Sequence, residues 1–191
     1  MPRDWDAYYQ GSPEAFDPAF VVRAYAFLLP GGEVLDLAGG TGRNAFFLAC
    51  RGHRVFLLEK SPVAVERVRA MAQRRRAAVH ALVADLEAAP GDLPSGPFAG
   101  VVVSYFVSRP LMAQLASRLK PGGLVLVEGF NRSEALRRGR PESPHYWEPG
   151  ELMRPPEGLE LLAAGEGWQE LAYRSWAVWR RAGNGAVELE P

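Results

Sequence analysis

The stretch VLDLAGGTGRN, residues 34–44, decides how the rest of the chain is arranged. Its alternating apolar residues predict a short buried strand, and the glycines that follow predict a tight turn. The apolar run AFFLAC at residues 45–50 predicts a helix. A strand, a glycine turn and a helix in this order bring bare main chain and the free N–H groups of a helix start to one place. The stretch therefore predicts a binding site for a small cofactor.

The composition is that of an ordinary globular protein. The chain has 191 residues, of which 48% are hydrophobic and 23% are charged, and its formal net charge at pH 7 is zero. This length favours one domain over residues 1–191 rather than two. Binding of nucleic acid is disfavoured for such a chain, because binding to its phosphates needs an excess of positive charge.

Targeting and cysteine signals favour the cytoplasm. The first residues, MPRDWDAYYQ, lack the basic and apolar segments of a secretory signal, and no apolar run reaches the roughly 20 residues that cross a bilayer. The single Cys50 has no disulfide partner within the chain, and no paired Cys or His spacing predicts a metal site. We therefore expect a cytoplasmic protein with no membrane partner and no bound metal. Monomer and homodimer both stay open.

Strands alternate with helices through the first two thirds of the chain. Apolar runs predict strands at residues 33–37, 54–58, 79–84, 98–104 and 124–128. Helical spacing and helix-start residues predict helices at residues 18–29, 45–50 and 111–119, and another from residue 62. Alternation of this kind favours a parallel sheet with helices on both faces, because parallel neighbours need a crossover.

The end of the chain has a different pattern. A Pro- and Arg-rich segment runs to about residue 149, and residues 150–153 predict a helical turn. Two final strands are predicted at residues 159–164 and 171–180. A short loop that contains GEG, residues 165–167, joins them, which favours an antiparallel hairpin.

These elements predict an α/β fold. We expect a single doubly wound Rossmann-like domain whose mostly parallel seven-stranded sheet carries the antiparallel hairpin at its C-terminal end. Residues 1–17, which contain Trp5, Tyr9 and Phe16, are expected to form a lid-like N-terminal segment. Residues 183–191 are expected to form a flexible tail.

An acidic residue follows the glycine turn at the distance that is typical of nucleotide-binding sites. Glu59 lies twenty positions after Gly39, where it is placed to accept hydrogen bonds from both hydroxyls of a ribose. Gly40, Gly42 and Ala45 also satisfy the dinucleotide spacing G-x-G-x-x-A, so an NAD-dependent oxidoreductase is one interpretation. The chain has no Tyr-x-x-x-Lys arrangement and no second domain for a hydride acceptor, which weighs against it.

Three further features indicate a methyl donor rather than a pyrophosphate carrier. Asp36 lies within the first strand, where a carboxylate would engage an ammonium group or organise the loop amides but would repel a pyrophosphate. Asp85 ends the third strand and can reach the exocyclic amine of an adenine. The third feature is LKPGGLVLVEGF at residues 119–130. Together they resemble class I S-adenosylmethionine-dependent methyltransferases, whose motifs match in order from residue 34 to residue 130.

Within that superfamily the chain resembles the tellurite-resistance methyltransferase-like group and related small-molecule methyltransferases. The residues that carry this resemblance are Trp5, Asp6 and Tyr9, GRNAFFLACRGHRV at 42–55, SYFVSRPL at 104–111 and GRPESPHYWEPGEL at 139–152. One departure is Ala38, where many members have the first glycine of the turn. The resemblance implies in-line transfer of a methyl group from S-adenosylmethionine to a small-molecule acceptor, a reaction accelerated by alignment and desolvation.

The resemblance also implies the cofactor contacts. Methionine and ribose would lie over the glycine turn, with the ribose hydroxyls on Glu59, the adenine between Lys60 and Leu86, and the backbone of Ser104 at the sulfonium. The cofactor set that it implies is Asp36, Ala38, Gly39, Gly40, Gly42, Asn44, Glu59, Lys60, Asp85, Leu86 and Ser104.

Four residues are candidates for the acceptor side, and all four are candidates for substrate binding. Tyr9 and Tyr105 would stabilise the sulfonium by cation–π contact. His145, in the loop after the fifth strand, is a candidate general base. These three are also the catalytic candidates. Arg109 would bind an anionic substrate, although a surface ion pair explains it equally well.

The nature of the acceptor is open at this point. The basic cluster Arg137, Arg138 and Arg140 is explained either by solvation or by recognition of an acidic substrate. Residues 104–107, SYFV, lack the Asn-Pro-Pro-aromatic signature of amine-methylating DNA enzymes. A module that binds S-adenosylmethionine without turnover is a further alternative.

Overall fold

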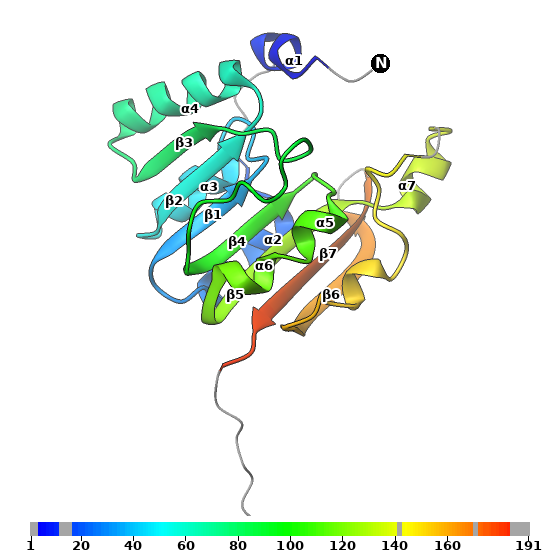
Figure 1. The fold of residues 1–191 in the computed structure, drawn as a ribbon. Coiled ribbons are helices and arrows are strands. Elements are labelled where there is room, and N and C mark those ends of the chain that lie inside the picture. The colour runs from blue at the N-terminus through cyan, green and yellow to red at the C-terminus, as the bar shows by residue number, and fades with distance from the viewer. Residues whose placement is uncertain (1–3, 12–16, 141–142, 170–171, 184–191) are drawn as a thin grey trace, which may run out of the picture.

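One mixed sheet organises the computed structural model, which describes residues 4–11, 17–140, 143–169 and 172–183. Within these residues seven strands follow the order β3-β2-β1-β4-β5-β7-β6 (Figure 1). Neighbouring strands from β3 to β5 are parallel, whereas β7 is antiparallel to both β5 and β6. The predicted fold class is therefore confirmed. Residues 184–191 of the tail expected at 183–191, and Phe16, lie outside the described residues.

The elements have the following bounds. The strands are β1 Glu33–Leu37, β2 Arg54–Glu59, β3 Val79–Val83, β4 Phe98–Ser104, β5 Leu119–Phe130, β6 Leu159–Gln169 and β7 Ala172–Arg181. The helices are α1 Trp5–Gly11, α2 Phe20–Tyr25, α3 Arg43–Ala49, α4 Pro62–Arg75, α5 Arg109–Met112, α6 Leu115–Arg118 and α7 Arg132–Arg137, with 3₁₀ helices η1 Ala26–Leu28 and η2 Glu151–Met153. In the part of the chain that the structure describes, none of these helices has both the length and the apolar character to span a membrane.

Parallel register gathers the carboxyl ends of the central strands. Leu37 of β1 pairs with Leu58 of β2 and with Val103 of β4. The chain order reverses here, because β2 and β3 extend from one side of β1 and β4 and β5 from the other. Ligands of open α/β sheets bind in the crevice outside such a switch point. The strand ends that the sequence singled out are therefore neighbours.

Helices cover both faces of the sheet (Figure 1). On one face α2, α3 and α4 bury Val22, Leu48 and Val68 against the strands. On the other face α5, α6 and the loop that carries Trp147 bury Leu111 and Leu115. Every residue of β4 is buried, which is why its sequence is a continuous apolar run rather than an alternating one.

α1 lies across the start of α4 and is held there by polar contacts (Figure 1). The Ser61 hydroxyl donates a hydrogen bond to the Asp6 carboxylate, and Arg67 donates one to the Tyr9 carbonyl. The helix buries none of its residues. Polar contacts with little apolar burial are typical of segments that open locally at low free energy.

Two predicted helices end differently in the structure. The helix expected at 18–29 stops at Tyr25 and continues as the 3₁₀ helix η1. The helix expected at 111–119 is instead the two short helices α5 and α6. Its last predicted residue, Leu119, starts β5 because it pairs with Phe98. Sheet pairing outweighs helical spacing at this point.

The prediction of a loop at GEG is wrong, and the helix α7 was not predicted. Residues 165–167 lie inside β6, and a Cβ on Gly165 would lie 2.8 Å from the Trp176 ring, so this glycine makes room for an indole rather than a turn. α7 follows β5 in the segment expected to be irregular. The Asn131 side chain caps it by accepting from the Glu134 N–H at 3.2 Å, and an Asn followed three residues later by Glu is a helix-start signal.

Gly123, the last residue of KPGG, generates a stability prediction. A Cβ there would lie 2.9 Å from the Lys120 carbonyl oxygen and 3.1 Å from that of Phe98. Main-chain atoms cannot move aside as a flexible side chain can, so we expect Gly123→Ala to lower the free energy of unfolding by about 1–3 kcal/mol, measured by urea denaturation. Gly31→Ala is the control, because no atom lies within 4 Å of its added Cβ. Equal midpoints for the two variants would contradict this packing.

Candidate functional site

Asp36 is a buried carboxylate near the end of β1. It is 0% exposed, and neither of its carboxylate oxygens has a hydrogen-bond partner among the described residues. Burial raises the pKa of Asp36 to about 7, an effect that the positive charge of Arg43 and the nearby Ala45 N–H and Asn44 side chain oppose. Buried polar groups normally have partners, so this one is a natural contact for a cation or a donor supplied by a ligand.

The glycine turn packs directly against this carboxylate. A Cβ on Gly39 would lie 3.0 Å from Oδ2 of Asp36 and 2.6 Å from the Leu57 side chain, so only glycine fits. Ala38 adopts φ +52°, a left-handed conformation that costs a residue with a Cβ about 1–2 kcal/mol. This left-handed conformation explains why many members of the resembling family have a glycine at this position. Ala38 adopts the same conformation.

Glu59 holds the glycine turn to the start of α4. It is buried at the end of β2, and its two carboxylate oxygens accept from the N–H groups of Gly40 and Ser61, each at 3.0 Å. Burial raises the pKa of Glu59, and these two N–H groups oppose the rise. Each oxygen retains a lone pair for a further donor, so the predicted ribose contact stays a prediction compatible with this geometry.

Lys60 and Asp85 meet beside Glu59. The Lys60 ammonium lies 2.8 Å from the Glu87 carboxylate and 3.5 Å from that of Asp85. Oδ1 of Asp85 accepts from the N–H groups of Glu87 and Ala88, and the Ala88 bond is the main cause of the lowered pKa of Asp85. Leu86 is buried between these exposed residues. This corner of the site combines an apolar surface with acceptors.

Asn44 links three elements behind the turn. Its Oδ1 accepts from the Ala19 N–H at 2.9 Å, and its Nδ2 donates to Oγ of Ser104 at 2.8 Å. Asn44 and Ser104 are both buried. Both were predicted to contact a cofactor. The structure uses their side chains to fix the end of β4 against α3, which leaves the Ser104 backbone for the predicted role.

Tyr105, directly after β4, belongs to a second buried network. Its hydroxyl donates to the Glu128 carboxylate at 2.8 Å, and its N–H donates to the Glu128 carbonyl at 2.8 Å. Burial and the negative charge of Glu128 raise the pKa of Tyr105. The phenol therefore stays protonated and engaged as a donor, and its ring has the Arg43 guanidinium 5.0 Å from its centre. The geometry suits an aromatic contact better than proton transfer.

Glu128 and its partner Arg174 were not predicted from the sequence as residues of the site. Glu128 is 0% exposed, accepts from the Val21 N–H at 2.8 Å and lies 3.6 Å from the Arg174 guanidinium. The signal that could have found it is a single acid inside the apolar run LVLVEGF. Such an acid must be paired, because an isolated buried charge is strongly unfavourable.

Tyr9 reaches the glycine turn from α1. A Cβ on Gly40 would lie 2.8 Å from the Tyr9 hydroxyl oxygen, and the Tyr9 ring stacks on Trp5 with ring centres 5.9 Å apart. Tyr9 of α1 therefore lies against the glycine turn, and the lid-like role of the N-terminal segment stays a prediction.

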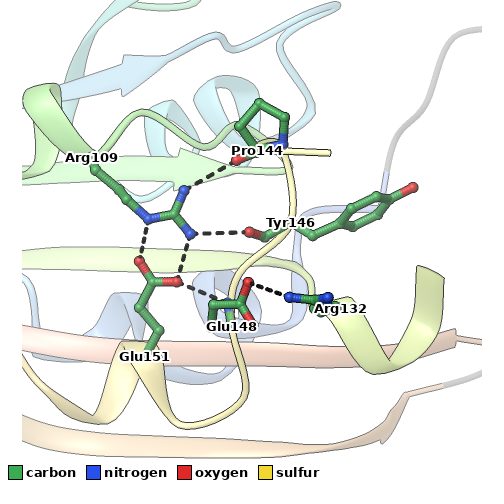
Figure 2. A network of polar contacts seen from close by, with 6 residues as sticks. All are labelled: Arg109, Arg132, Pro144, Tyr146, Glu148 and Glu151. Atoms are coloured by element: carbon green, nitrogen blue, oxygen red, sulfur yellow. Dashed lines mark hydrogen bonds and ion pairs between the residues drawn. The ribbon is translucent and has the colours of Figure 1, made fainter. Parts of the chain in front are cut away.

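Arg109 anchors the loop before η2 (Figure 2). Its guanidinium donates two hydrogen bonds to the Glu151 carboxylate, at 2.7 and 2.8 Å, which raise the pKa of Arg109. It also donates to the carbonyls of Pro144 and Tyr146, both at 3.2 Å. An anionic substrate would have to displace Glu151 to use this residue, so the geometry favours the ion-pair explanation.

His145 lies in the same loop and is exposed. Its Nδ1 is 4.0 Å from the Glu87 carboxylate, which places it beside the turn after β3. Its main-chain N–H donates to the Ser143 hydroxyl at 3.2 Å. The side chain therefore borders the corner that contains Lys60 and Asp85, and its role as a general base stays a prediction.

A cavity of about 340 Å³ lies between α7 and residues 143–148. Its lining residues are Arg132, Ala135, Leu136, Arg140, Ser143, Pro144, Tyr146 and Glu148. A smaller cavity of about 50 Å³ shares Ala135, Arg140 and Tyr146 with it and is also lined by Phe130. The Phe130 ring packs on Tyr105 with ring centres 5.0 Å apart. Phe130 thus separates the cavities from the buried network at the strand ends.

A family model and curated relatives match the central part of the chain. Residues 34–123 match a model described as a methyltransferase domain. Ribosomal protein L11 methyltransferase from Burkholderia mallei (strain NCTC 10229) is 36% identical over 110 residues, which are 56% of this chain. The chain covers 34% of that relative, so it spans about a third of the length of the curated relatives that it matches.

Solved structures share the fold over most of the chain. A structure concerned with conversion of a disulfide bond into a thioacetal group during echinomycin biosynthesis has a TM-score of 0.72 and 23% identity, covering 95% of this chain and 92% of that one. TehB from Haemophilus influenzae has 0.69 and 17%, over 84% and 61%. Magnesium protoporphyrin IX methyltransferase from Synechocystis PCC 6803, with S-adenosylhomocysteine bound, has 0.65 and 16%, over 94% of each chain. At these identities the likeness shows the fold.

The raised pKa of Asp36 predicts a stability that falls as the pH rises. The folded pKa is about 7 and the ordinary value is 3.8, so the folded state holds the proton more tightly. The stabilisation is full below pH 3.8 and is lost as the pH rises toward 7. Between pH 5 and pH 8 we expect the wild-type protein to lose about 2–3 kcal/mol of unfolding free energy relative to Asp36→Asn, measured by urea denaturation at both values. A difference that does not change with pH would show that Asp36 is ionised in the fold.

Proposed function

We propose that this chain is a class I S-adenosylmethionine-dependent methyltransferase that transfers a methyl group from S-adenosylmethionine to a small-molecule acceptor, which the match of residues 34–123 to a methyltransferase domain and the shared fold support. The observation that carries the proposal is the fully buried carboxylate of Asp36, whose oxygens have no partner among the described residues and lie against the glycine turn. A ligand with an ammonium group fits that position. When bound, S-adenosylmethionine supplies the methyl group on a positively charged sulfur.

The strand ends provide a contact for each part of this cofactor. In our proposal the glycine turn and Asp36 hold the methionine end, and Glu59 accepts the ribose hydroxyls while it keeps its bonds to the turn. Leu86 supplies the apolar surface for the adenine, between Lys60 and the acceptor oxygens of Asp85. These groups are already fixed by parallel register, so little ordering is needed on binding.

Residues around the methyl group act by position rather than by covalent chemistry. Asn44 fixes Ser104 and with it the backbone at the end of β4. In our proposal the Tyr105 ring, which the Glu128 hydrogen bond holds in place and which already has the Arg43 and Arg174 guanidinium groups beside it, borders the positively charged sulfur. Tyr9 lies over Gly40, and in our proposal α1 thereby shields the site from water. We propose further that residues 1–191 act as one domain.

The acceptor class rests on the cavity beside α7. Its volume of about 340 Å³ is within the range of small-molecule sites. A protein acceptor is the second candidate, because the matched relatives from Burkholderia are named for ribosomal protein L11. Transfer of labelled methyl groups to a metabolite panel, with ribosomal protein L11 as the competing acceptor, separates the two. Labelling of neither would favour a module that binds S-adenosylmethionine without turnover.

An NAD-dependent oxidoreductase fits this site less well. The Asp36 carboxylate borders the turn where a pyrophosphate would lie, and charges of the same sign repel each other. Fluorescence titration with NADH tests this alternative, and saturable binding would support it.

Binding of S-adenosylhomocysteine tests the cofactor assignment. We expect the wild-type protein to bind it in a calorimetric titration, and Glu59→Ala to weaken binding by about 1–3 kcal/mol because buried ribose hydroxyls lose their acceptor. Glu66→Ala is the control, since Glu66 is exposed on α4 and pairs with Arg69. Circular dichroism verifies that both variants fold.

The outcomes of this titration are distinct. Unchanged affinity in folded Glu59→Ala would remove the ribose role from this residue. Absence of binding by folded wild-type protein would contradict the proposed function as a whole.

A further inference from the structure

We propose that the cavity between α7 and residues 143–148 binds the acid group of an organic anion with an apolar body, with Arg140 and Arg132 as its cationic contacts. This inference rests on the proposed function, because it names the class of acceptor that the methyl-transfer site would take. It starts from the basic cluster for which the sequence left two explanations open.

The charges around the cavity do not balance. Arg137 and Arg138 both pair with the Glu134 carboxylate, and the hydrogen bonds from Arg137 are the main cause of the pKa of Glu134 falling to about 2. Arg132 lies 3.5 Å from the Glu148 carboxylate. For the exposed guanidinium of Arg140 the described residues provide neither a hydrogen bond nor an ion pair. Among the described residues, the positive charge of Arg140 is therefore available to an anion at this cavity.

The remaining lining suits an apolar body. Ala135 and Leu136 of α7 face the cavity together with Pro144 and Tyr146 of the loop. Leu136 is 64% exposed, so its side chain has unburied apolar surface that a ligand would cover. A small concave site with apolar walls and one or two charged groups is the usual form of a small-molecule pocket.

Arg109 and Glu151 hold in place the loop that forms one wall of the cavity, through the contacts drawn in Figure 2. Arg109 fixes the carbonyls of Pro144 and Tyr146, and its partner Glu151 also accepts from the Glu148 N–H at 2.8 Å. The Arg109 side chain thus determines where Tyr146 and Glu148 stand relative to α7. A preformed wall reduces the ordering that a ligand must impose.

The two cavities also give the ligand a direction. Arg132 lines the larger cavity, Arg140 lines both, and Phe130 lines the smaller cavity and contacts Tyr105. An anion seated at Arg140 and Arg132 would place its apolar body on the side of Phe130, the residue that lies between the cavities and Tyr105.

Binding of small aromatic probes to protein saturated with S-adenosylhomocysteine tests the proposal. We expect 4-hydroxybenzoate to bind more tightly than its neutral isostere 4-hydroxybenzamide in a calorimetric titration. Arg140→Gln should weaken 4-hydroxybenzoate binding about tenfold, because it removes one charged hydrogen bond, and should leave amide binding unchanged. The double variant with Arg132→Gln should abolish the preference for the acid. Phenyl phosphate in place of the carboxylate shows which oxyanion the site prefers.

Arg23→Gln is the matched control, since Arg23 is an exposed arginine on α2. Equal affinities for acid and amide, absence of binding by the acid, or equal losses in Arg140→Gln and Arg23→Gln would each overturn the proposal. The affinity for S-adenosylhomocysteine is measured separately and should be the same in all variants. If the wild-type protein fails to bind S-adenosylhomocysteine, the proposed function fails; if it binds that molecule but not the anions, only this inference fails.

Discussion

The contact between the Asp36 carboxylate and the glycine turn is the constraint on which the site depends. The acid is fully buried near the end of a central strand, and the turn packs so closely on it that Gly39 has no room for a Cβ. A buried carboxylate without partners opposes folding. Its retention is easiest to understand if a ligand supplies the missing positive charge, because local destabilisation of this kind is typical of functional sites.

Two polar networks transmit this geometry to the neighbouring strands, and both end at the start of α2. Ala19 and Val21 donate their N–H groups to Asn44 and Glu128, respectively. α2 has no side-chain cap of its own, so groups that are distant in sequence satisfy its first donors. The helix start, the end of β4 and the end of β5 are therefore fixed relative to one another. Tertiary contacts supply here what a local Ser or Asp supplies in other helices.

The sheet and the gathering of the proposed cofactor residues at its strand ends could be predicted from the sequence, because period-two runs, glycines and acids at strand ends are local signals. The acceptor half could not. Arg109 and its partner Glu151 are 42 residues apart, and Glu128 reaches Val21 across 107 residues. Nothing in the local pattern tells whether such a side chain faces a ligand or another part of the chain. The loop at GEG was predicted wrongly for the same reason, because Gly165 makes room for the Trp176 ring, which is distant in sequence.

The proposed cofactor half and the proposed acceptor half of the site are stabilised by different interactions, and this difference bears on specificity. Strand register and fully buried groups define the cofactor half, so substitutions there disturb the core. The acceptor half is built from the six-residue α7 and one loop, joined by pairs such as Arg109 with Glu151 and Arg132 with Glu148. These pairs are largely exposed, and exposed ion pairs typically contribute no more than about 1 kcal/mol each. A loop held in this way can be reshaped for another acceptor without loss of the fold, whereas the turn over Asp36 cannot. A common cofactor half with a variable acceptor half is therefore the expected outcome of this division of stability.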